Sequence, residues 1–335
     1  LIAPDDGLRE FFDEFLPPER IKLIATSGTA DFFKTLNREL HSGKYEIAHS
    51  HGFSAGVIGS VANYFSNVTH IMTGHDVFSH VQFSGFKGKI KKSILAVLFS
   101  RLDVIHTISN DASSNFMEYF PSIKKEKFHF IMNGIDTKYF EFGEANNLRK
   151  DIGAADGQPV LGFFGRFMAQ KGFRIFVDAM KVIVDKKLVS QLPIVATFGW
   201  GGFVREDFEY IEQLGLSDYF VQMAETSDMP ANLKSIDLVV MPSRWEACPL
   251  LPMEALSAGV PIIGTNCLGL GEVLMGSPAD IVTVGDVDLL AKTIVDNIVN
   301  SKKALFLDYQ SIAVKRFDVE LTANNLFELY QSVSD

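Results

Sequence analysis

Two glutamates have the residue type and the spacing to bind a sugar. Glu246 and Glu254 lie eight positions apart, the first in an expected loop and the second about one turn into an expected helix. A buried strand is predicted before the loop by the apolar run SIDLVVMP, and Pro249 is expected as the first helical residue because its missing N–H is not needed there. Carboxylates in such positions can hydrogen-bond hydroxyl groups, while free amides at a helix start can bind phosphate. Together these features indicate a sugar nucleotide, although two such glutamates also occur by chance and a helix-start Glu can simply compensate the helix dipole.

A pair of cations follows another expected strand, PVLGFFG. Arg166 comes directly after Gly165, and Lys171 follows five positions later with Gly172 behind it. Two cations beside a glycine that lets the backbone approach could hold a diphosphate. The alternative is a pair of solvated surface cations.

The composition is that of a globular protein with 335 residues, of which 47% are hydrophobic and 21% charged. This length suits two domains better than one core. The net charge of −10 argues against a nucleic-acid partner, which would require a basic face. Two cysteines are too few for a disulfide framework, so a cytoplasmic setting is expected. No apolar run is long enough to span a membrane, and because the chain opens at Leu1 without Met, we expect the native N-terminus to precede it.

Strand and helix patterns alternate along almost the whole chain, which indicates parallel sheets. A polar stretch, 144–158, is the expected linker between two domains. The expected strands are 20–26, 45–51, 68–75, 104–109 and 128–134 in the first half, and 159–165, 192–199, 237–242, 260–265 and 280–284 in the second. The expected helices of the first half are 29–43, 54–65, 87–102 and 112–120, and an amphipathic helix is expected at the end of the chain.

The stretch around the two glutamates closely resembles the Glu-x7-Glu signature of the family 4 glycosyltransferases, retaining enzymes of the GT-B fold. Gly165–Gly172 is similar to the family's Gly-Arg…Lys-Gly motif, and Asn133–Asp136 to its Asn-Gly-Val-Asp. The resemblance implies an α/β protein with two doubly wound Rossmann-like domains that face each other across a cleft. Residues 1–150 would form the acceptor-side domain and 151–317 the nucleotide-sugar domain, with a helix at about 318–335 crossing back to the first. The resemblance covers essentially the whole chain, but the family's first strand and glycine-rich acceptor loop, expected ahead of Leu1, are missing.

The Glu-x7-Glu resemblance also implies roles for individual residues. Glu246 would contact the transferred sugar, the amides of Leu250 and Leu251 would bind the diphosphate or the sugar, and Glu254 would bind the ribose. Many family members have glycines after the first Glu, whereas this chain has Ala247 and Cys248, so Cys248 is expected to alter the donor pocket.

The other motifs imply further donor contacts. Arg166 and Lys171 would neutralise the leaving nucleoside diphosphate, so no divalent metal is required, and the chain has no clear Asp-x-Asp metal signature. Gly165 and Gly199 would border the nucleotide. Glu272 would lie near the diphosphate, or alternatively serve as a helix-start carboxylate.

Histidines follow two strands of the first half. His75 resembles a family histidine that contacts the donor sugar near its reacting carbon, and positioning is favoured over general-base catalysis. A lone histidine is more often structural. His49 and His51 share a strand face, but no nearby carboxylate or thiol supports a metal site, and acceptor contact by His51 is an open alternative.

The sequence therefore predicts a glycosyltransferase of hexosyltransferase type that acts in polysaccharide biosynthesis. The resemblance implies a retaining, metal-independent front-face mechanism, a UDP- or GDP-linked donor, no cofactor, and a glycan, lipid-linked or small-molecule acceptor. The lysines at Lys87–Lys92 predict a peripheral contact with the inner face of the membrane, unless they form an ordinary solvated helix face. The alternatives are a nucleotide-sugar epimerase of the same fold and a non-catalytic sugar-nucleotide-binding protein. A dehydrogenase is disfavoured because no strand is followed by Gly-x-Gly-x-x-Gly.

Overall fold

A computed structural model describes residues 1–17 and 20–334 and divides into two compact units. Unit 1 comprises Leu1–Ile108, Ser113–Ile131 and Leu326–Asp335, and unit 2 comprises Ser109–Ala112 and Met132–Asn325. The boundary at Ile131 lies earlier than the expected boundary at 150. The expected linker is instead packed within unit 2, where Asn146 bonds to Ser235 and Asn232, and Arg149 forms an ion pair with Asp237 at 2.9 Å.

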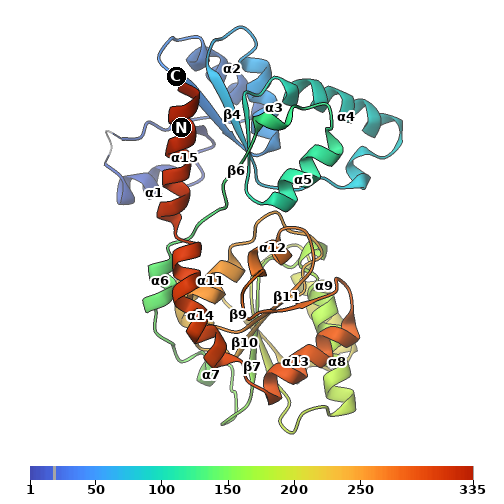
Figure 1. Cartoon of the computed structure of the whole chain (residues 1–335). Helices are drawn as coiled ribbons and strands as arrows, with labels where there is room; N and C mark the ends of the chain where they lie inside the picture. Colours follow the sequence, from blue (N-terminus) through green and yellow to red (C-terminus); the bar gives the residue numbers. More distant parts are fainter. Residues whose placement is uncertain (18–19, 335) are drawn as a thin grey trace. The chain divides into compact units, whose positions relative to one another are not determined.

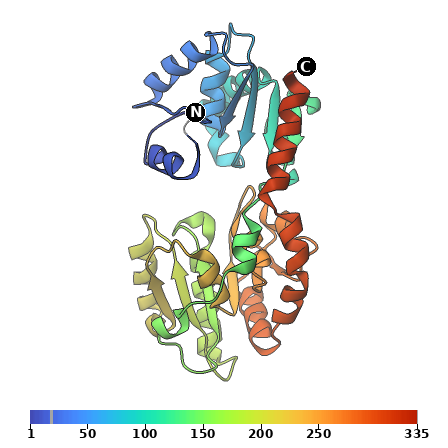
Figure 2. The same cartoon turned by 90° about the vertical axis from the view of Figure 1, so that its left-hand side faces the viewer.

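Unit 1 is built on a four-stranded parallel sheet in the order β3-β4-β5-β6 (Figures 1 and 2). Its strands are β3 (Ile47–His51), β4 (Thr69–Gly74), β5 (Val104–Thr107) and β6 (Phe128–Phe130). A separate two-stranded parallel sheet pairs β1 (Ile2–Ala3) with β2 (Ile24–Ala25). The α-helices are α1 (Leu8–Phe15), α2 (Thr29–Leu40), α3 (Phe53–Ala62), α4 (Gly85–Ser100) and the greater part of α5 (Asn110–Tyr119), and the 3-10 helices are η1 (His80–Phe83) and η2 (Lys125–Lys127).

Alternating residues of the unit 1 strands supply two separate cores. Met72 of β4 and Ile105 of β5 face one cluster, which contains Phe99 of α4 and Phe116 of α5. Their neighbours Ile71 and Val104 face the other side of the sheet, where Leu329 covers them. This side change between consecutive residues is the period-two pattern of a strand. Both faces of the sheet are covered in this way, as expected for a buried parallel sheet.

Unit 2 contains a six-stranded parallel sheet in the order β12-β11-β10-β7-β8-β9. Its strands are β7 (Val160–Phe164), β8 (Ile194–Phe198), β9 (Phe220–Met223), β10 (Leu238–Met241), β11 (Ile262–Thr265) and β12 (Asp280–Val282). Its helices are α6 (Thr137–Phe142), α7 (Leu148–Asp151), η3 (Ala169–Lys171), α8 (Phe173–Lys186), α9 (Val204–Gln213), η4 (Ser217–Tyr219), α10 (Met229–Lys234), α11 (Leu251–Ser257), α12 (Leu270–Leu274), α13 (Val287–Val299), α14 (Lys303–Arg316) and the first part of α15 (Val319–Ser334).

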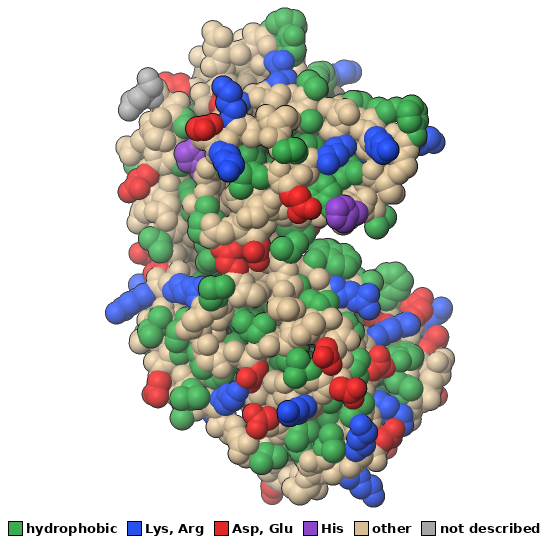
Figure 3. All heavy atoms as spheres, turned by 45° about the vertical axis from the view of Figure 1, so that its right-hand side comes forward, with side chains coloured by type: hydrophobic (Ala, Val, Ile, Leu, Met, Phe, Trp, Pro, Cys, Tyr) green, Lys and Arg blue, Asp and Glu red, His purple; other side chains and the backbone are tan. Residues whose placement is uncertain are grey.

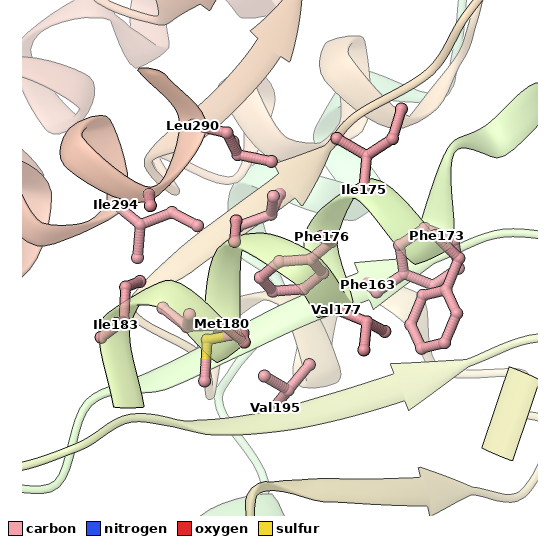
Figure 4. Close-up of a cluster of buried hydrophobic side chains, with 14 of the residues drawn as sticks. Phe163, Phe173, Ile175, Phe176, Val177, Met180, Ile183, Val195, Leu290 and Ile294 are labelled. Atoms are coloured by element: carbon pink, nitrogen blue, oxygen red, sulfur yellow. The ribbon is translucent and has the colours of Figure 1, made fainter. Parts of the chain in front are cut away.

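The main core of unit 2 lies between this sheet and the helices α8 and α13. Phe173, Phe176 and Met180 of α8 are almost fully buried and project toward Phe163 of β7 and Val195 of β8 (Figure 4). Full burial of one such aromatic or aliphatic side chain contributes roughly 1.5–3 kcal/mol. This core fixes the strands of the sheet, and with them the loops that follow the carboxyl ends of β7 and β8.

Several expected boundaries differ from the structure. The strand expected at 20–26 is confined to β2. Pro249 is not the first helical residue, because α11 begins at Leu251 and Pro252 is the proline of its first turn. A proline is tolerated there for the same reason, since the first amides of a helix need no intrahelical acceptor.

The amphipathic helix expected at the end of the chain is two helices, α14 and α15. The break occurs at Phe317 and Asp318, where Ile135 pairs with the chain: its N–H donates to the Phe317 carbonyl at 2.8 Å and its carbonyl accepts from Val319 N–H at 2.9 Å. Residue 335, the last of the expected helix, lies outside the described part of the chain. Within that part, no helix has the length and apolar character needed to cross a membrane.

Candidate functional site: a donor edge in unit 2

The predicted donor residues of unit 2 lie in loops that follow adjacent strands. β7 is the direct neighbour of both β10 and β8. Because all three strands are parallel, the loop 165–172 after β7, the loop 199–203 after β8 and the loop 242–250 after β10 emerge at the same edge of the sheet. We call this the donor edge. Ligands of doubly wound sheets bind at this type of edge.

Lys171 and Glu246 form an ion pair on the donor edge. Lys171 Nζ lies 2.7 Å from Glu246 Oε1, and the side chains of the two residues are only 20% and 7% exposed. Ser243 Oγ donates a second hydrogen bond, of 2.8 Å, to the same carboxylate oxygen. Glu246 Oε2 accepts no hydrogen bond from any residue in 1–17 or 20–334. The carboxylate is therefore held in one orientation while its second oxygen remains available to a ligand hydroxyl.

The backbone ties the same loops together. Arg244 N–H donates to the Gln170 carbonyl at 2.7 Å, and Gln170 Nε2 donates to the Trp245 carbonyl at 2.9 Å. Gly172 has a φ of +67°, and a Cβ at this position would meet the Pro242 carbonyl oxygen at 2.0 Å. The close approach of these loops explains why Lys171 reaches Glu246 although the two residues are far apart in sequence.

Arg166 and Gly199 flank this pair along the donor edge. Arg166 is exposed, and it forms no salt bridge with the residues that the structure describes. Gly165 N–H donates to the Phe198 carbonyl at 2.9 Å, so β7 and β8 continue to pair beyond their ends. A Cβ on Gly199 would lie 1.9 Å from the Gly165 carbonyl oxygen, which requires glycine there. Arg166 thus presents an available guanidinium beside a backbone that comes unusually close.

Glu254 is a half-buried residue whose carboxyl forms no ion pair with the described residues. It lies one turn into α11, and none of the described residues donates a hydrogen bond to its side chain. Desolvation by burial raises the pKa of Glu254 to about 7. A perturbed carboxyl of this kind is typical of a ligand-binding position, because the ligand supplies the missing hydrogen bonds.

The start of α11 also leaves amides for a ligand. No side chain caps the helix at Leu250, and Glu254 N–H donates to the Leu250 carbonyl at 3.0 Å. The amides of Leu250 and Leu251 therefore have the availability that phosphate binding requires.

Cys248 and Glu272 were both predicted to contact the donor. In the structure, Cys248 is buried and Glu272 is hydrogen-bonded to other residues of the protein. Burial raises the pKa of the Cys248 thiol to about 12, and its side chain is 7% exposed. The Glu272 carboxylate accepts hydrogen bonds from the amides of Asn110 and Asp111, at 3.0 and 2.9 Å, and from Asn110 Nδ2 at 2.7 Å. Glu272 is thus engaged at the start of α5, within the segment Ser109–Ala112 that clusters with unit 2.

His75 lies in unit 1, directly after β4, and is not part of the donor edge. Its Nε2 is 3.1 Å from Nδ1 of His51, at the end of the neighbouring β3, and the two rings are stacked with centroids 5.4 Å apart. Burial lowers the pKa of His75, and the neighbouring His51 lowers it further. His75 is thereby kept neutral at neutral pH, which suits positioning by hydrogen bonds better than acid catalysis.

Behind this pair, unit 1 holds an ordered hydrogen-bond chain. The Ile131 carbonyl can only accept, so His106 Nε2 donates to it at 2.9 Å, and His106 Nδ1 accepts from Thr73 Oγ1 at 2.8 Å. Thr73 then accepts from His49 Nε2, and His49 Nδ1 accepts from Tyr330, both at 2.6 Å. Burial lowers the pKa of His49 to about 3, so its imidazole is neutral. The hydrogen bonds then fix the tautomers of His49 and His106.

Sequence reasoning missed Ser243 and this hydrogen-bond chain. Ser243 stands three positions before Glu246, a spacing that can bring a hydroxyl to a carboxylate in a loop, and this was the available signal. Nothing in the sequence separates His106 and Tyr330 from ordinary core residues. Among residues 1–17 and 20–334, no group of three or more His, Cys, Asp or Glu is arranged to hold a metal ion.

Two Rossmann-like units with parallel sheets, one of which carries a carboxylate, a lysine and an exposed arginine at its strand ends, form the architecture of the glycosyltransferase GT-B class. Comparison with family models places the chain within that class. Residues 2–139 match the model Glycosyltransferase Family 4, and residues 158–300 match Glycosyl transferases group 1. The chain belongs to the family 4 glycosyltransferases, as the motifs predicted.

Individual relatives agree with this membership. The chain is 27% identical over 283 residues to UDP-Gal:alpha-D-GlcNAc-diphosphoundecaprenol alpha-1,3-galactosyltransferase of Escherichia coli, which covers 80% of this chain and 70% of that protein. It is 33% identical over 150 residues to the lipopolysaccharide core biosynthesis mannosyltransferase LpsB of Rhizobium meliloti, which covers 44% of this chain and 42% of LpsB. Among solved structures, HepE of Anabaena in complex with UDP-glucose matches with a TM-score of 0.84 and 21% identity, covering 99% of this chain and 91% of HepE. The predicted GT-B fold is confirmed.

Proposed function

We propose that this glycosyltransferase moves a hexose from a UDP-sugar to a lipid-linked or glycan acceptor with retention of configuration. The observation that carries the proposal is the ion pair of Lys171 with the buried Glu246, oriented by Ser243, next to the exposed Arg166. Glu246 binds hydroxyls of the transferred sugar, and the two cations bind the diphosphate. Glu254 binds the ribose hydroxyls, which supply the hydrogen bonds that its desolvated carboxyl does not receive from the described residues.

The names of the relatives support the choice of substrates. The Escherichia coli relative is named for a UDP-galactose donor and a diphosphoundecaprenol-linked acceptor. The Anabaena neighbour was crystallised with UDP and with UDP-glucose. A UDP-hexose donor and a lipid diphosphate acceptor are therefore the first substrates to test.

In the proposed reaction, the acceptor hydroxyl oxygen forms a bond to the anomeric carbon on the face from which the nucleoside diphosphate leaves. The bond between that carbon and the phosphate oxygen breaks, and the departing oxygen takes the acceptor proton. Arg166 and Lys171 stabilise the charge that develops on the diphosphate, so the proposal requires no divalent cation. His75 keeps the positioning role that its motif predicts, and such a role suits a neutral imidazole.

The test compares donor turnover in wild type, Glu246→Gln and Arg166→Ala. The matched controls are Glu209→Gln and Arg205→Ala, which alter an exposed ion pair on α9. We expect turnover with UDP-hexose and a lipid diphosphate acceptor to fall about 100-fold or more in each site variant, and to be unchanged in the controls and in EDTA. Full activity in both site variants would refute the assignment, loss of activity in EDTA would refute metal independence, and inversion at the anomeric carbon, followed by NMR, would refute retention.

The same assay separates the rival functions. An epimerase would convert the UDP-sugar without an acceptor, and a non-catalytic binding protein would show a thermal shift with UDP-sugars but no turnover. Neither rival is supported by the relatives, which are named as transferases.

We also propose that α4 docks on an anionic membrane surface. Phe86, Ile90, Ile94 and Val97 are spaced three or four positions apart, so they form one stripe, and they are 79%, 45%, 55% and 64% exposed. Lys87, Lys89, Lys91 and Lys92 lie on the same helix. Hydrophobic and cationic side chains lie side by side over this part of unit 1 (Figure 3). An apolar stripe with flanking lysines is the pattern of an interfacial helix.

Vesicle flotation tests the membrane proposal. Each lysine near an anionic surface contributes about 1 kcal/mol, so Lys87→Gln with Lys91→Gln should weaken binding to phosphatidylglycerol vesicles about 30-fold. Phe86→Ser with Ile90→Ser should abolish binding, whereas Leu305→Ser, at a 54% exposed position of α14, should leave it unchanged. Equal binding to neutral phosphatidylcholine vesicles, or no effect of either double variant, would contradict the proposal.

A further inference from the structure

Trp200 stands out on the donor edge as an uncovered aromatic ring on a fixed backbone. It is 61% exposed, although tryptophan is one of the side chains that folding most readily covers. It lies within Gly199–Gly202, where the remaining three residues are all glycines. The transferase chemistry assigned above, which depends on sugar and phosphate contacts, makes no use of this ring.

The backbone around Trp200 is held against the diphosphate-binding loop. Its carbonyl accepts from Phe167 N–H at 2.9 Å, which continues the pairing of β7 with β8 by one step beyond the contact between Gly165 and Phe198. Trp200 therefore lies directly beside Arg166, on the neighbouring strand extension. A Cβ on Gly201 would come within 2.8 Å of the Phe167 carbonyl oxygen. The backbone therefore packs closely against the β7 loop at Gly199 and at Gly201, the residues before and after the tryptophan. Its backbone is fixed while its ring extends into solvent.

The position along the sheet indicates which part of a donor meets the ring. Glu246, which binds the sugar, follows β10, and Arg166 follows β7. Trp200 follows β8, on the far side of β7 from β10. The diphosphate lies between the sugar and the nucleoside, so with the diphosphate on Arg166 and the ribose on Glu254 the base is free to extend toward the loop after β8, the direct neighbour of β7. The base is the only planar aromatic part of such a donor, and stacking on an indole suits it.

We infer that Trp200 is the platform on which the nucleobase of the donor stacks. This inference rests on the proposed function. Stacking uses the π-face that every base presents, so Trp200 contributes affinity for the nucleoside without selecting uracil. Purine diphosphates, with their larger face, gain at least as much from the ring as UDP does, and base selectivity comes from other residues.

The chain offers a direct spectroscopic test, because Trp200 and Trp245 are its two tryptophans. In Trp245→Phe, the remaining indole fluorescence comes from Trp200. We expect UDP and GDP to quench it on binding and inorganic pyrophosphate, which has no base, to leave it unchanged. Quenching by pyrophosphate to the same extent, or none by UDP at saturation, would overturn the inference.

Affinity measurements complete the test. Loss of base stacking corresponds to roughly a 5- to 150-fold weakening, so Trp200→Ala should lower the affinity for UDP and GDP by that factor, while Trp200→Phe should retain most of it. Pyrophosphate should bind Trp200→Ala as tightly as wild type, which also shows that the exposed substitution leaves the fold and the cations intact. Unchanged UDP affinity in Trp200→Ala would refute the stacking role alone. Failure of folded wild type to bind UDP, GDP or pyrophosphate would instead refute the proposed function.

Discussion

Glu254 should make donor binding depend on pH in a direction that its burial determines. Desolvation raises the pKa of this carboxyl from 4.5 to about 7, so in the empty protein at neutral pH about half the molecules carry a protonated Glu254. Ribose hydroxyls donate hydrogen bonds, and the carboxylate accepts them better than the acid does. Donor binding should therefore favour the ionised form, release protons and become tighter as the pH rises through 7.

The magnitude follows from the same pKa. If the donor binds only the ionised form, the apparent Kd is multiplied by the ratio of total to ionised Glu254. This factor falls from about 11 at roughly pH 6 to about 1.1 at roughly pH 8, a tenfold gain in affinity. At pH near 7, binding should release about half a proton per donor.

Calorimetry in two buffers with different ionisation enthalpies measures both quantities. The ligand should be an intact UDP-sugar rather than UDP, because a terminal phosphate titrates in the same range. Glu254→Gln should bind the UDP-sugar more weakly, with no pH dependence and no proton release, while the exposed control Glu209→Gln should behave as wild type. A wild-type Kd that is flat between these pH values, or the same slope in Glu254→Gln, would refute the reasoning.

Three further predictions concern the residues that build the donor edge. Ser243→Ala removes a buried hydrogen bond to a charged carboxylate, about 1.5–3 kcal/mol, and should lower kcat/KM for the UDP-sugar by roughly 10- to 150-fold. Because the bond is present in the empty protein, its loss should also lower Tm; an unaltered kcat/KM would argue against the positioning role of Ser243. Gly199→Ala should lower Tm by several degrees because its Cβ would overlap the Gly165 carbonyl oxygen. Gly202→Ala, at a position with open space around it, should leave Tm unchanged, and equal Tm values for the two variants would contradict the close approach of Gly199 to Gly165. Cys248 and Cys267 are both buried, and burial raises the pKa of each thiol, so neither should react with a thiol reagent in native protein and both should react after unfolding; rapid labelling of native protein would disagree.

The sequence predicted where the strands of the donor edge end, whereas their order in the sheet comes from the structure. Apolar runs ending at Gly165, Gly199 and Pro242 marked the carboxyl ends of buried strands, and in a parallel sheet these ends meet at one edge. Periodicity could not give details that depend on partners distant in sequence. The break between α14 and α15 exists because Ile135 pairs with the chain at Asp318, and no local pattern around Asp318 reports that contact.

The candidate site was predictable by residue type more than by interaction. Lys171 and Glu246 were each identified from a motif, but their ion pair depends on a hydrogen bond between Arg244 and Gln170 that brings two loops together. Similarly, the sequence suggested a diphosphate role for Glu272, while the structure places its carboxylate on the amides of Asn110 and Asp111. Which partner a charged side chain finds is set by tertiary packing, which spacing in the sequence does not encode.

The arrangement of charges on the donor edge explains why one carboxyl is paired and the other is not. Glu246 is almost fully buried, and its ion pair with Lys171 offsets part of the cost of burying a carboxylate. Glu254 forms no ion pair with the described residues, and its raised pKa lets it lose its charge in the empty site. A diphosphate would bring negative charge to the same edge. Its binding is favoured because Lys171 balances the charge of Glu246 and a proton can neutralise Glu254. Arg166 in turn is exposed and forms no salt bridge with the described residues, so its guanidinium is available to the diphosphate. The two glutamates thus differ in the way each is kept compatible with an anionic donor, although they belong to one sequence motif.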